Sequence, residues 1–378
     1  MKILHVVPSF YPAIKWGGPI RSTKAICDGV AGLPDMSVRV LTTDAASPDR
    51  GDRAGPAALP YPVHYARRRA GHAIAPGLLA RLPGAVAWAD VVHLTATYSF
   101  PTLPTLALAR AMGRPVVWSP RGALQATADW ADAPRKRAKH LFERAAQVLR
   151  PRDTVLHVTS TAEAAQSVAR LPGITTALVP NAVDIPALNL RPMPPDTRLR
   201  LLYLGRLHPK KGLDLLFDTM AKLPRDVVLD VYGTGAPDYT ATLHRRAAQS
   251  GGRITLHGHV EGAAKARAFA AADIFVLPSH SENFGIAVAE ALAHALPVIT
   301  TTGTPWQDLD HQGCGRCIDL HRADLAAEIM DLAGADLRRM GVTGRDWMRR
   351  DFSTDAMVSA FAKLYRDLTA HPQDPVLA

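Results

Sequence analysis

Residues 274–292 read IFVLPSHSENFGIAVAEAL, which is an apolar strand followed by a glycine turn and the start of a helix. The turn carries Glu282, and the helix carries Glu290 eight residues further on. A helix that begins near Phe284 exposes free backbone N–H groups, at which a diphosphate could bind. Carboxylate oxygens accept hydrogen bonds strongly from sugar hydroxyls. The stretch therefore predicts a nucleotide-sugar site, with Glu282 at the sugar and Glu290 at the ribose.

Two isolated glutamates could equally be solvated surface residues. Glu290, however, is embedded in the almost wholly apolar stretch 286–293. A charged side chain within a buried helix needs a partner. We therefore prefer the functional interpretation of the pair.

The segment 281–285, the second glutamate and the sequence Ala-Leu-Pro-Val-Ile-Thr-Thr at 295–301 resemble the Glu-x7-Glu motif of retaining GT-B glycosyltransferases of family four. This resemblance covers essentially the whole chain. It implies an α/β fold of the GT-B type, in which two Rossmann-like, doubly wound parallel-sheet domains face a central cleft. It also implies that the turn into the helix binds the nucleotide through Asn283, Phe284, Gly285 and Ile286.

Short apolar strands alternate with helical stretches along the chain, which predicts parallel sheets with helices on both faces. The expected strands are 1–8, 38–42, 91–94, 116–118 and 155–159, and then 199–205, 228–233, 254–258, 274–277 and 297–301. The proline-rich segment 185–196 forbids regular structure and is the expected linker.

Three parts follow from this division. Residues 1–185 form an N-terminal acceptor-binding domain, and residues 186–352 form a C-terminal nucleotide-sugar-binding domain. By resemblance, a C-terminal helix at 353–370 crosses back onto the first domain, and the tail from His371 is expected to be loose.

The composition also supports two domains, because 378 residues with 47% hydrophobic content exceed one ordinary core. Apolar runs fall short of the roughly 20 residues that a transmembrane helix requires. The first eight residues are too short for the apolar core of a signal peptide. Three cysteines suit a reducing compartment, and the lone Cys314-x-x-Cys317 spacing is a weak metal signal. We expect a cytoplasmic protein.

The net charge of +10 lies entirely in the first half of the chain. Residues 1–185 carry 22 lysines and arginines against 12 acidic residues, and the remainder is balanced. The densest basic runs are 67–69 and 135–140. A domain with this excess of positive charge suggests an anionic partner, either a membrane bearing a lipid diphosphate acceptor or a nucleic acid. RNA-binding aromatic motifs and helix-turn-helix patterns are missing from the sequence, so we expect peripheral contact with the inner face of the cell membrane and no nucleic acid.

The loop 205–213 follows the first strand of the second domain and contains Arg206, Lys211 and Gly212. Without a metal, a departing nucleoside diphosphate must be stabilised by fixed cations, and Arg206 and Lys211 supply them. Either residue alone could belong to an ordinary basic loop. Their spacing matches the phosphate-binding pair of the family, so we assign Glu282, Arg206 and Lys211 as the catalytic residues.

Candidate residues in the first domain lie in loops after strands. By resemblance to the Gly-Gly loop of the family, Gly18 approaches the diphosphate, and Lys15 and Arg21 contact the acceptor. Arg121 either holds an acceptor phosphate or hydroxyl or forms a salt bridge. His93 occupies the first position of a His-x-His found in relatives and is a candidate substrate contact, although a core histidine is the stronger interpretation. Thr95 replaces the second histidine of that His-x-His motif in the first domain.

The second domain offers further nucleotide contacts. Gly233 belongs to a Gly-x-Gly turn that resembles one near the nucleotide in relatives, and His259 and Val260 occupy the segment whose backbone contacts the base. The acidic triplet 308–310 is unlike a metal motif in its position, so we expect no metal and no cofactor beyond the nucleotide diphosphate sugar.

These observations predict a retaining hexosyltransferase that moves a sugar from a nucleotide diphosphate to an acceptor hydroxyl. The expected acceptor is a saccharide, lipid-linked, of cell-surface polysaccharide assembly (exopolysaccharide, O-antigen or capsule). An epimerase or a phosphorylase on the same architecture remains an alternative, as does a non-enzymatic nucleotide-sugar sensor. The donor sugar, the base and the acceptor all stay open.

Overall fold

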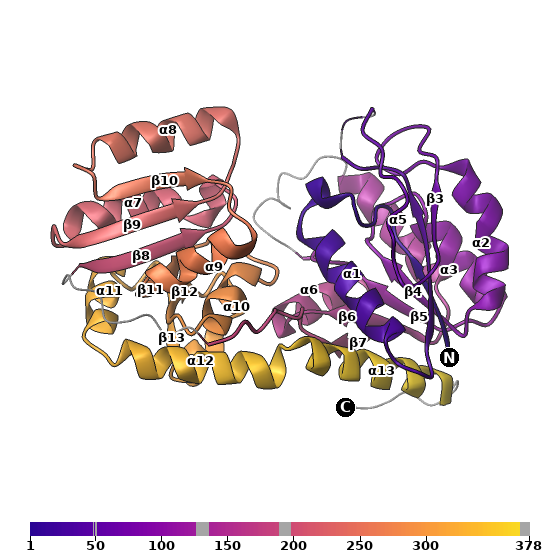
Figure 1. Ribbon diagram of the computed structural model, residues 1–378. Coiled ribbons are helices and arrows are strands. Elements are labelled where there is room, and N and C mark those ends of the chain that lie inside the picture. The colour runs from indigo at the N-terminus through magenta and orange to yellow at the C-terminus, as the bar shows by residue number, and fades with distance from the viewer. Residues whose placement is uncertain (48, 50, 126–135, 189–197, 371–378) are drawn as a thin grey trace. The chain divides into compact units, whose positions relative to one another are not determined.

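The computed structural model describes residues 1–47, 49, 51–125, 136–188 and 198–370 (Figure 1). The tail from His371 and most of the proline-rich linker lie outside the described residues. The chain forms two compact units. Unit 1 comprises Met1–Ala182 together with the chain from Thr354 onward, and unit 2 comprises Val183–Ser353.

Unit 1 contains a seven-stranded sheet in which every pairing is parallel, in the order β3-β2-β1-β4-β5-β6-β7. Its strands are β1 (Lys2–Val6), β2 (Ser37–Thr43), β3 (Val63–Ala66), β4 (Val91–Thr95), β5 (Val116–Ser119), β6 (Thr154–Val158) and β7 (Thr175–Leu178). Its helices are η1 (Ile14–Trp16), α1 (Gly18–Ala31), α2 (Pro76–Trp88), α3 (Thr102–Ala111), α5 (Lys136–Leu149), α6 (Thr161–Arg170) and α13 (Thr354–Ala370).

The central strands of unit 1, β1, β4, β5 and β6, are buried on both faces, as a sheet covered by helices on both sides requires. In β1, Leu4 and Val6 join the core beneath α2 and α3, whereas Ile3 points into the core beneath α1 and α13. The last helix, α13, packs against α1 (Figure 1). The chain thus returns to complete the core of the unit in which it began.

A chain of buried hydrogen bonds crosses the α13 side of this sheet. The Tyr365 hydroxyl lies 2.6 Å from Nδ1 of His93, and Nε2 of His93 lies 2.7 Å from Oγ of Ser119. The Ser119 hydroxyl also lies 2.6 Å from Nδ1 of His157, whose Nε2 donates to the carbonyl of Val179 over 2.9 Å. Since buried polar groups are costly unless satisfied, this chain of bonds helps to fix α13 on the sheet.

Unit 2 contains a six-stranded sheet, again with only parallel pairings, in the order β10-β9-β8-β11-β12-β13. Its strands are β8 (Leu199–Leu204), β9 (Val227–Tyr232), β10 (Ile254–Gly258), β11 (Ile274–Leu277), β12 (Val298–Thr301) and β13 (Gly315–Ile318). Its helices are η2 (Pro209–Lys211), α7 (Leu213–Lys222), α8 (Pro237–Ala248), α9 (Gly262–Ala271), α10 (Ile286–Ala293), η3 (Gln307–Leu309), α11 (Leu325–Ala333) and α12 (Leu337–Asp351).

Helix α10 is the central helix of unit 2, and α12 packs closely against the turn that follows it. A Cβ atom added at Gly341 of α12 would lie 1.9 Å from the carbonyl oxygen of Ala295, so the approach depends on glycine. Arg345, which is 5% exposed, donates from Nη1 to the carbonyl of Ala293 at the end of α10 over 2.6 Å. The guanidinium thereby caps the negative end of that helix.

The predicted fold class is confirmed, because both units are α/β and both sheets are parallel with helices on their two faces. Three strands were not anticipated, namely β3, β7 and β13, and all three are short strands at sheet edges. Within the described ranges, none of the helices combines the length and the apolar character needed to span a bilayer.

The buried histidines of unit 1 predict a loss of stability in mild acid. Burial lowers the pKa of His5 and of His157 to about 3, with Arg121 adding to the effect, and burial lowers the pKa of His93 as well. The unfolded chain therefore binds protons first as the pH falls below about 6.5, while the folded chain does not. Stability is complete above about pH 7, and each histidine removes about 1.4 kcal/mol per pH unit between about pH 6 and its folded-state pKa.

Denaturant unfolding at pH 7.5 and pH 5.5, followed by tryptophan fluorescence, measures this loss. His5→Leu should flatten the pH dependence, because neither ring nitrogen of His5 has a hydrogen-bond partner within the described residues. His321→Leu, at an exposed position of unit 2, is the matched control and should leave the dependence unchanged. Equal pH dependence in the wild type and in His5→Leu would contradict the assignment.

Candidate functional site

The order of strands in unit 2 locates the site. From β8 the chain adds β9 and β10 on one side of the sheet, and it then crosses over to add β11, β12 and β13 on the other side of β8. The neighbouring strands β8 and β11 therefore mark the point at which the strand order reverses. In doubly wound sheets, ligands bind outside the carboxyl ends of the strands at such a switch point. The loop after β8 carries Arg206 and Lys211, and the loop after β11 carries Glu282. All three predicted catalytic residues thus flank the switch point.

Lys211 and Glu282 are in direct contact. The Nζ atom of Lys211 forms an ion pair with Oε1 of Glu282, and their side chains are only 13% and 12% exposed. The backbone joins the same two loops, because the N–H of His280 donates to the carbonyl of Lys210 over 2.8 Å. The cation and the carboxylate are therefore held together by their loops as well as by their charges.

Gly212 allows the two loops to approach this closely. It has φ +72°, in the left-handed region, and a Cβ atom there would lie 1.9 Å from the carbonyl oxygen of Pro278. Both the conformation and the space exclude a side chain. Gly212 thus closes the loop after β8 against the end of β11.

The electrostatics of the pair favour an anionic ligand. Burial lowers the pKa of Lys211, Glu282 offsets this in part, and Lys210 and Arg206 add to the lowering. Arg206 is exposed, and its side chain makes no hydrogen bond or ion pair with a described residue. A diphosphate placed between these groups would offset the repulsion among the cations.

The loops after β9 and β10 lie against the same edge. The N–H of Gly233 donates to the carbonyl of Gly258 over 2.7 Å, and a Cβ atom at Gly233 would lie 1.8 Å from the carbonyl oxygen of Gly205. His259 and Val260 follow β10, and His259 pairs with Glu261 at 3.3 Å while remaining 65% exposed. Gly233 therefore contacts both Gly258, just before the predicted base-contacting segment, and Gly205, just before Arg206.

Helix α10 begins at Gly285, which caps it with φ +75°. Oδ1 of Asn283 is buried and has no hydrogen-bond partner among the described residues. The ring of Phe284 is buried against Trp306, so only the backbone of Phe284 is available to a ligand. Ile286 is 41% exposed at the first turn. The helix start therefore offers unpaired backbone N–H groups and one unpaired amide oxygen.

Glu290 has the partner that its burial requires. The Nζ atom of Lys265 on α9 lies 2.6 Å from Oε1 of Glu290, and the two side chains are 20% and 22% exposed. Sequence reasoning missed Lys265, since a lysine on a surface helix gives no distinguishing signal.

In unit 1, Gly18 is the first residue of α1, and the exposed Arg21 lies in its first turn. Lys15 precedes them in η1, is 67% exposed and pairs with Asp52 at 2.7 Å. These residues follow β1, which is one of the two strands at the switch point of its sheet. The arrangement permits a ligand contact at the start of α1, and Lys15 pairs with Asp52 rather than with Arg21.

Arg121 is held in an unusual conformation directly after β5. Its φ is +55°, and its Nη1 donates to Oδ1 of Asn181 over 3.0 Å. Nε and Nη2 are buried without hydrogen-bond partners in the described part of the chain. Burial lowers the pKa of Arg121 to about 10. A strained residue with unpaired charged donors is a functional candidate.

The turn that carries Arg121 is fixed by Glu163, which sequence reasoning also missed. The buried carboxylate of Glu163 accepts hydrogen bonds from the N–H groups of Gly122 at 2.6 Å and Thr159 at 2.8 Å. Ser160 caps α6 by accepting from the N–H of Glu163. The Ser160-x-x-Glu163 spacing is a capping-box signature and could have indicated this residue.

His93 is a core residue, and its assignment as a substrate contact is corrected here. It is fully buried, and both ring nitrogens are occupied by Tyr365 and Ser119. The alternation of β4 points it at α13 rather than at the carboxyl edge of the sheet. The sequence analysis had preferred this core interpretation.

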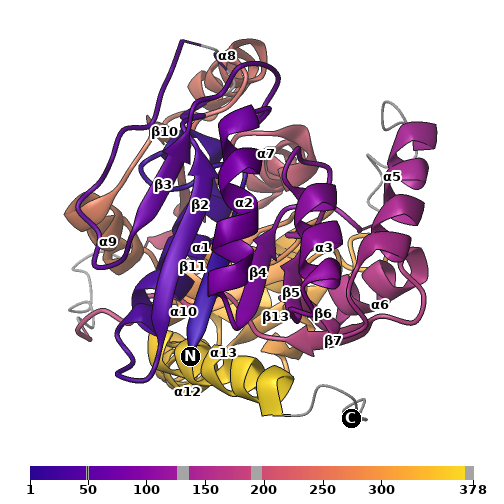
Figure 2. The same cartoon turned by 90° about the vertical axis from the view of Figure 1, so that its right-hand side faces the viewer.

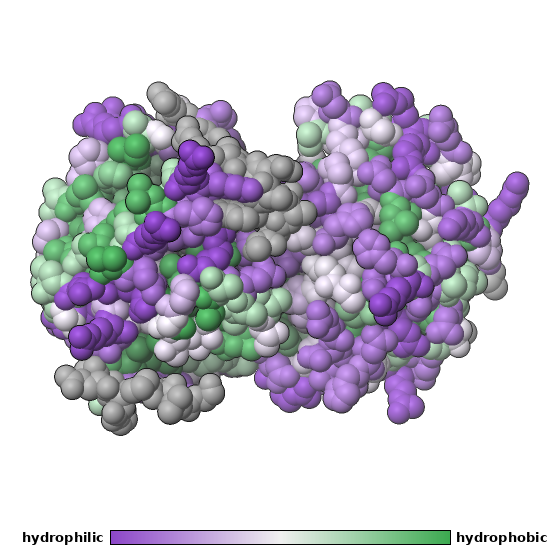
Figure 3. All heavy atoms as spheres, turned by 180° about the vertical axis from the view of Figure 1, so that it is seen from behind, coloured by the Kyte–Doolittle hydropathy of each residue, from purple (hydrophilic) through white to green (hydrophobic). Residues whose placement is uncertain are grey.

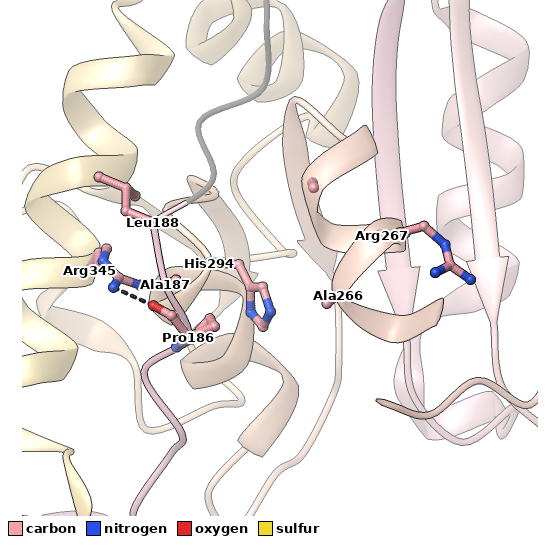
Figure 4. A pocket seen from close by; sticks show the side chains of 8 residues that line it. Pro186, Ala187, Leu188, Ala266, Arg267, His294 and Arg345 are labelled. Carbon is pink, nitrogen blue, oxygen red and sulfur yellow. Dashed lines mark hydrogen bonds between the residues drawn. The ribbon is translucent and has the colours of Figure 1, made fainter. Parts of the chain in front are cut away.

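A cavity of about 130 Å³ in unit 2 lies apart from the predicted site residues (Figure 4). It is lined by Pro186, Ala187, Leu188, Ala266, Arg267, Ala270, His294 and Arg345. Arg345 donates to the carbonyl of Pro186, as the dashed line in Figure 4 marks. This contact anchors the chain that enters unit 2.

As for metals, the described residues contain no cluster of three or more His, Cys, Asp or Glu side chains suited to an ion.

The fold resembles solved glycosyltransferase structures. Anabaena HepE, solved in complex with UDP, aligns with a TM-score of 0.72 at 18% identity over 97% of this chain and all of that one. Sucrose-phosphate synthase from Thermosynechococcus elongatus aligns with a TM-score of 0.74 at 20% identity over 98% and 100% of the two chains. At such identities the likeness shows the fold alone, which is GT-B.

Sequence comparison identifies the family. The family model described as glycosyl transferase 4-like domain matches residues 17–182, and that described as glycosyl transferases group 1 matches residues 198–334. The chain therefore belongs to the group 1 glycosyltransferases, which confirms the predicted family.

Individual relatives match parts of the chain. D-inositol 3-phosphate glycosyltransferase of Xylanimonas cellulosilytica is 30% identical over 56% of this chain and 57% of its own length. Glycogen synthase of Anaeromyxobacter is 33% identical over 47% and 40%, and phosphatidyl-myo-inositol mannosyltransferase of Mycolicibacterium smegmatis is 30% identical over 44% and 45%. The chain spans about half the length of the curated relatives it matches.

Gly212→Ala should destabilise unit 2 strongly. The left-handed backbone costs alanine about 1 kcal/mol, and the overlap with Pro278 adds roughly 1–3 kcal/mol. Gly251→Ala is the matched control, since its φ is +67° but a Cβ atom there meets nothing within 4 Å. Denaturant unfolding of both variants measures the difference, and equal losses of stability would contradict the close approach of the loops.

Proposed function

We propose that this protein is a retaining hexosyltransferase that uses a nucleoside diphosphate sugar as donor. The observation that carries the proposal is the meeting of Arg206, the Lys211–Glu282 pair and the start of α10 at the switch point of unit 2. Fixed cations beside a carboxylate match a ligand with a diphosphate next to a sugar. The HepE structure with UDP supports testing uridine nucleotides first.

In the proposed reaction, the bond between the anomeric carbon and the diphosphate oxygen breaks while the acceptor oxygen bonds to the same face of that carbon. Lys211, Arg206 and the N–H groups of α10 stabilise the charge on the departing diphosphate. The acceptor proton passes to a diphosphate oxygen. Glu282 accepts hydrogen bonds from sugar hydroxyls and orients the sugar without attacking it.

The Lys211–Glu282 pair also indicates what donor binding must change. Each charge of the pair neutralises the other, in a place where both side chains are largely shielded from water. A bound diphosphate would become the new partner of Lys211, and sugar hydroxyls would become partners of Glu282. The site therefore exchanges one set of charge-assisted hydrogen bonds for another instead of desolvating bare charges.

We place the acceptor on unit 1 and propose a lipid-linked saccharide of cell-surface polysaccharide assembly. Arg121 supports an anionic acceptor group, because two of its guanidinium nitrogens have no partner among the residues that the structure describes. The names of two relatives, an inositol 3-phosphate glycosyltransferase and a phosphatidylinositol mannosyltransferase, include phosphate-bearing acceptors. Gly18, Arg21 and Lys15 are proposed to complete this side.

Glu282→Gln and Lys211→Ala test the donor site. Loss of a preorganised charge at a developing anion should lower kcat by about 10²–10³ in each variant. Donors are first identified by a thermal-shift screen of nucleotide sugars, since a ligand that binds only the folded chain raises its stability. Lys222→Ala, an exposed lysine in the same unit, is the control and should retain full activity.

Turnover near that of the wild type in both variants would end the assignment. Product stereochemistry, read by NMR of the anomeric proton, decides between retention and inversion. Donor epimerisation or phosphate consumption without transfer would favour the epimerase or phosphorylase alternative. Binding without any turnover would favour a sensor.

We also propose that unit 1 contacts an anionic membrane through α5, which packs on α3 at the edge of the unit (Figure 2). Its exposed face presents Arg137, Leu141, Arg144 and Val148 at helical spacing, with Leu141 69% and Val148 68% exposed. The one acidic residue in α5, Glu143, is buried against Arg170. On unit 1, Figure 3 shows hydrophobic residues scattered among hydrophilic ones, which suits contact with lipid headgroups.

Arg137→Gln with Arg144→Gln should weaken binding to anionic vesicles by about fivefold for each charge removed. Vesicle flotation with neutral phosphatidylcholine and with phosphatidylglycerol-containing vesicles measures the effect. Arg67→Gln with Arg69→Gln removes the same charge from exposed positions elsewhere in unit 1 and is the control.

Leu141→Ser with Val148→Ser should also weaken vesicle binding, whereas Leu178→Ser, 50% exposed on β7, should not. Equal effects of the α5 and control variants would remove α5 from the contact. Binding of an RNA oligonucleotide that depends on the arginines but not on Leu141 and Val148 would favour a nucleic acid instead.

A further inference from the structure

Helix α10 has a single open side. Six of its eight residues are buried in the core of unit 2, and the two exceptions are Ile286 and Glu290. These two residues are four positions apart, which is about one helical turn, so they lie on the same face of α10. The sequence predicts Glu290 at the ribose, so this face would meet a donor bound as in the proposed function.

Glu290 does not face the donor with both oxygens unpaired. Lys265 on α9 approaches it from the side and places Nζ 2.6 Å from Oε1, at a depth where both side chains are about one-fifth exposed. The adjacent Arg267 on α9 is exposed and lines the cavity of Figure 4. Among the described residues, the Glu290 carboxylate has no second hydrogen-bond or ion-pair partner.

We infer that Lys265 is a positioning residue that holds Glu290 for recognition of the donor ribose. The ammonium fixes Oε1, so that Oε2 is left to accept hydrogen bonds from the ribose hydroxyls. A carboxylate oxygen accepts hydrogen bonds strongly from a diol and donates none. This inference rests on the proposed function, because it assumes a nucleotide in unit 2.

The position of α9 places the Lys265–Glu290 ion pair close in the chain to the predicted base-contacting segment. Helix α9 follows directly on the segment of His259 and Val260, which is the predicted neighbour of the base. The Lys265–Glu290 pair therefore joins the helix after the base-contacting loop to the helix that presents the ribose acceptor. A freely rotating glutamate would lose side-chain entropy on binding, and an ion pair formed beforehand reduces that cost.

Two other roles for Lys265 make different predictions. An ordinary partly exposed ion pair contributes little, and its removal would leave nucleotide binding unchanged. A direct phosphate contact would weaken the binding of every diphosphate equally, whether or not its ribose is complete. Only a positioning role couples Lys265 to the ribose hydroxyls.

Calorimetric titration of the full chain with UDP and with 2′-deoxy-UDP separates these roles. The wild type should prefer UDP by about tenfold, the value of one charge-assisted hydrogen bond. Lys265→Met should bind UDP about tenfold more weakly and reduce the preference to within about threefold. Lys265→Arg should restore most of the preference, and Glu290→Gln should remove it.

Arg267→Met is the matched control, two residues along α9, and should bind both nucleotides as the wild type does. Thermal unfolding of each variant confirms that it is folded, and Lys265→Arg serves as the second variant if Lys265→Met is not. An unchanged preference in Lys265→Met would overturn the inference, and so would an equal loss for both nucleotides.

The same titrations with GDP and 2′-deoxy-GDP cover the other common base. Wild-type binding with no discrimination between ribose and deoxyribose would overturn the role of Lys265 and leave the donor site in place. No binding of either diphosphate by the wild type would overturn the proposed function itself, and the inference with it.

Discussion

The switch point between β8 and β11 is the constraint on which the candidate site depends. Parallel strands end at one edge, and the reversal of strand order separates the helices that follow the two central strands. The loops can then close against each other only if backbone meets backbone. Gly212 under Pro278 and Gly233 under Gly205 provide that approach, since a Cβ atom at either glycine would overlap a carbonyl oxygen. These close backbone contacts bring Lys211 and Glu282 of the two loops together.

Both predicted carboxylates of unit 2 are paired with a lysine. Glu282 pairs with Lys211 across the switch point, and Glu290 pairs with Lys265 between two helices. Each pair sets an opposite charge beside a carboxylate that is largely shielded from water and fixes the position of that carboxylate. Unit 1 uses the opposite solution on the α13 side of its sheet, where neutral histidines and hydroxyls hydrogen-bond in a row. A charged core there would have required its own counter-ions.

Much of the fold was predictable because the central strands are buried on both faces and read as short apolar runs. The edge strands β3, β7 and β13 were not, since a strand with one neighbour needs less apolar sequence, and Thr175–Leu178 is half exposed. Among the site residues, Lys211 and Glu282 were predicted separately, but their direct contact was not. His93 was named as a substrate contact and lies in the core, because the motif alone cannot say which face of β4 a side chain occupies.

The sequence by itself determined the parallel α/β class, the family and the loops that carry the chemistry, because apolar periodicity and motif spacing are local along the chain. Only the tertiary structure decided which side chains meet. Lys265 is 25 residues from Glu290, and Tyr365 is 272 residues from His93. The left-handed conformation of Arg121 was equally invisible in the sequence, since Glu163 holds the N–H of Gly122 and Asn181 holds Nη1 of Arg121 from other parts of the chain. Contacts of this kind depend on how helices and strands pack, and packing is set by the whole core rather than by any one segment.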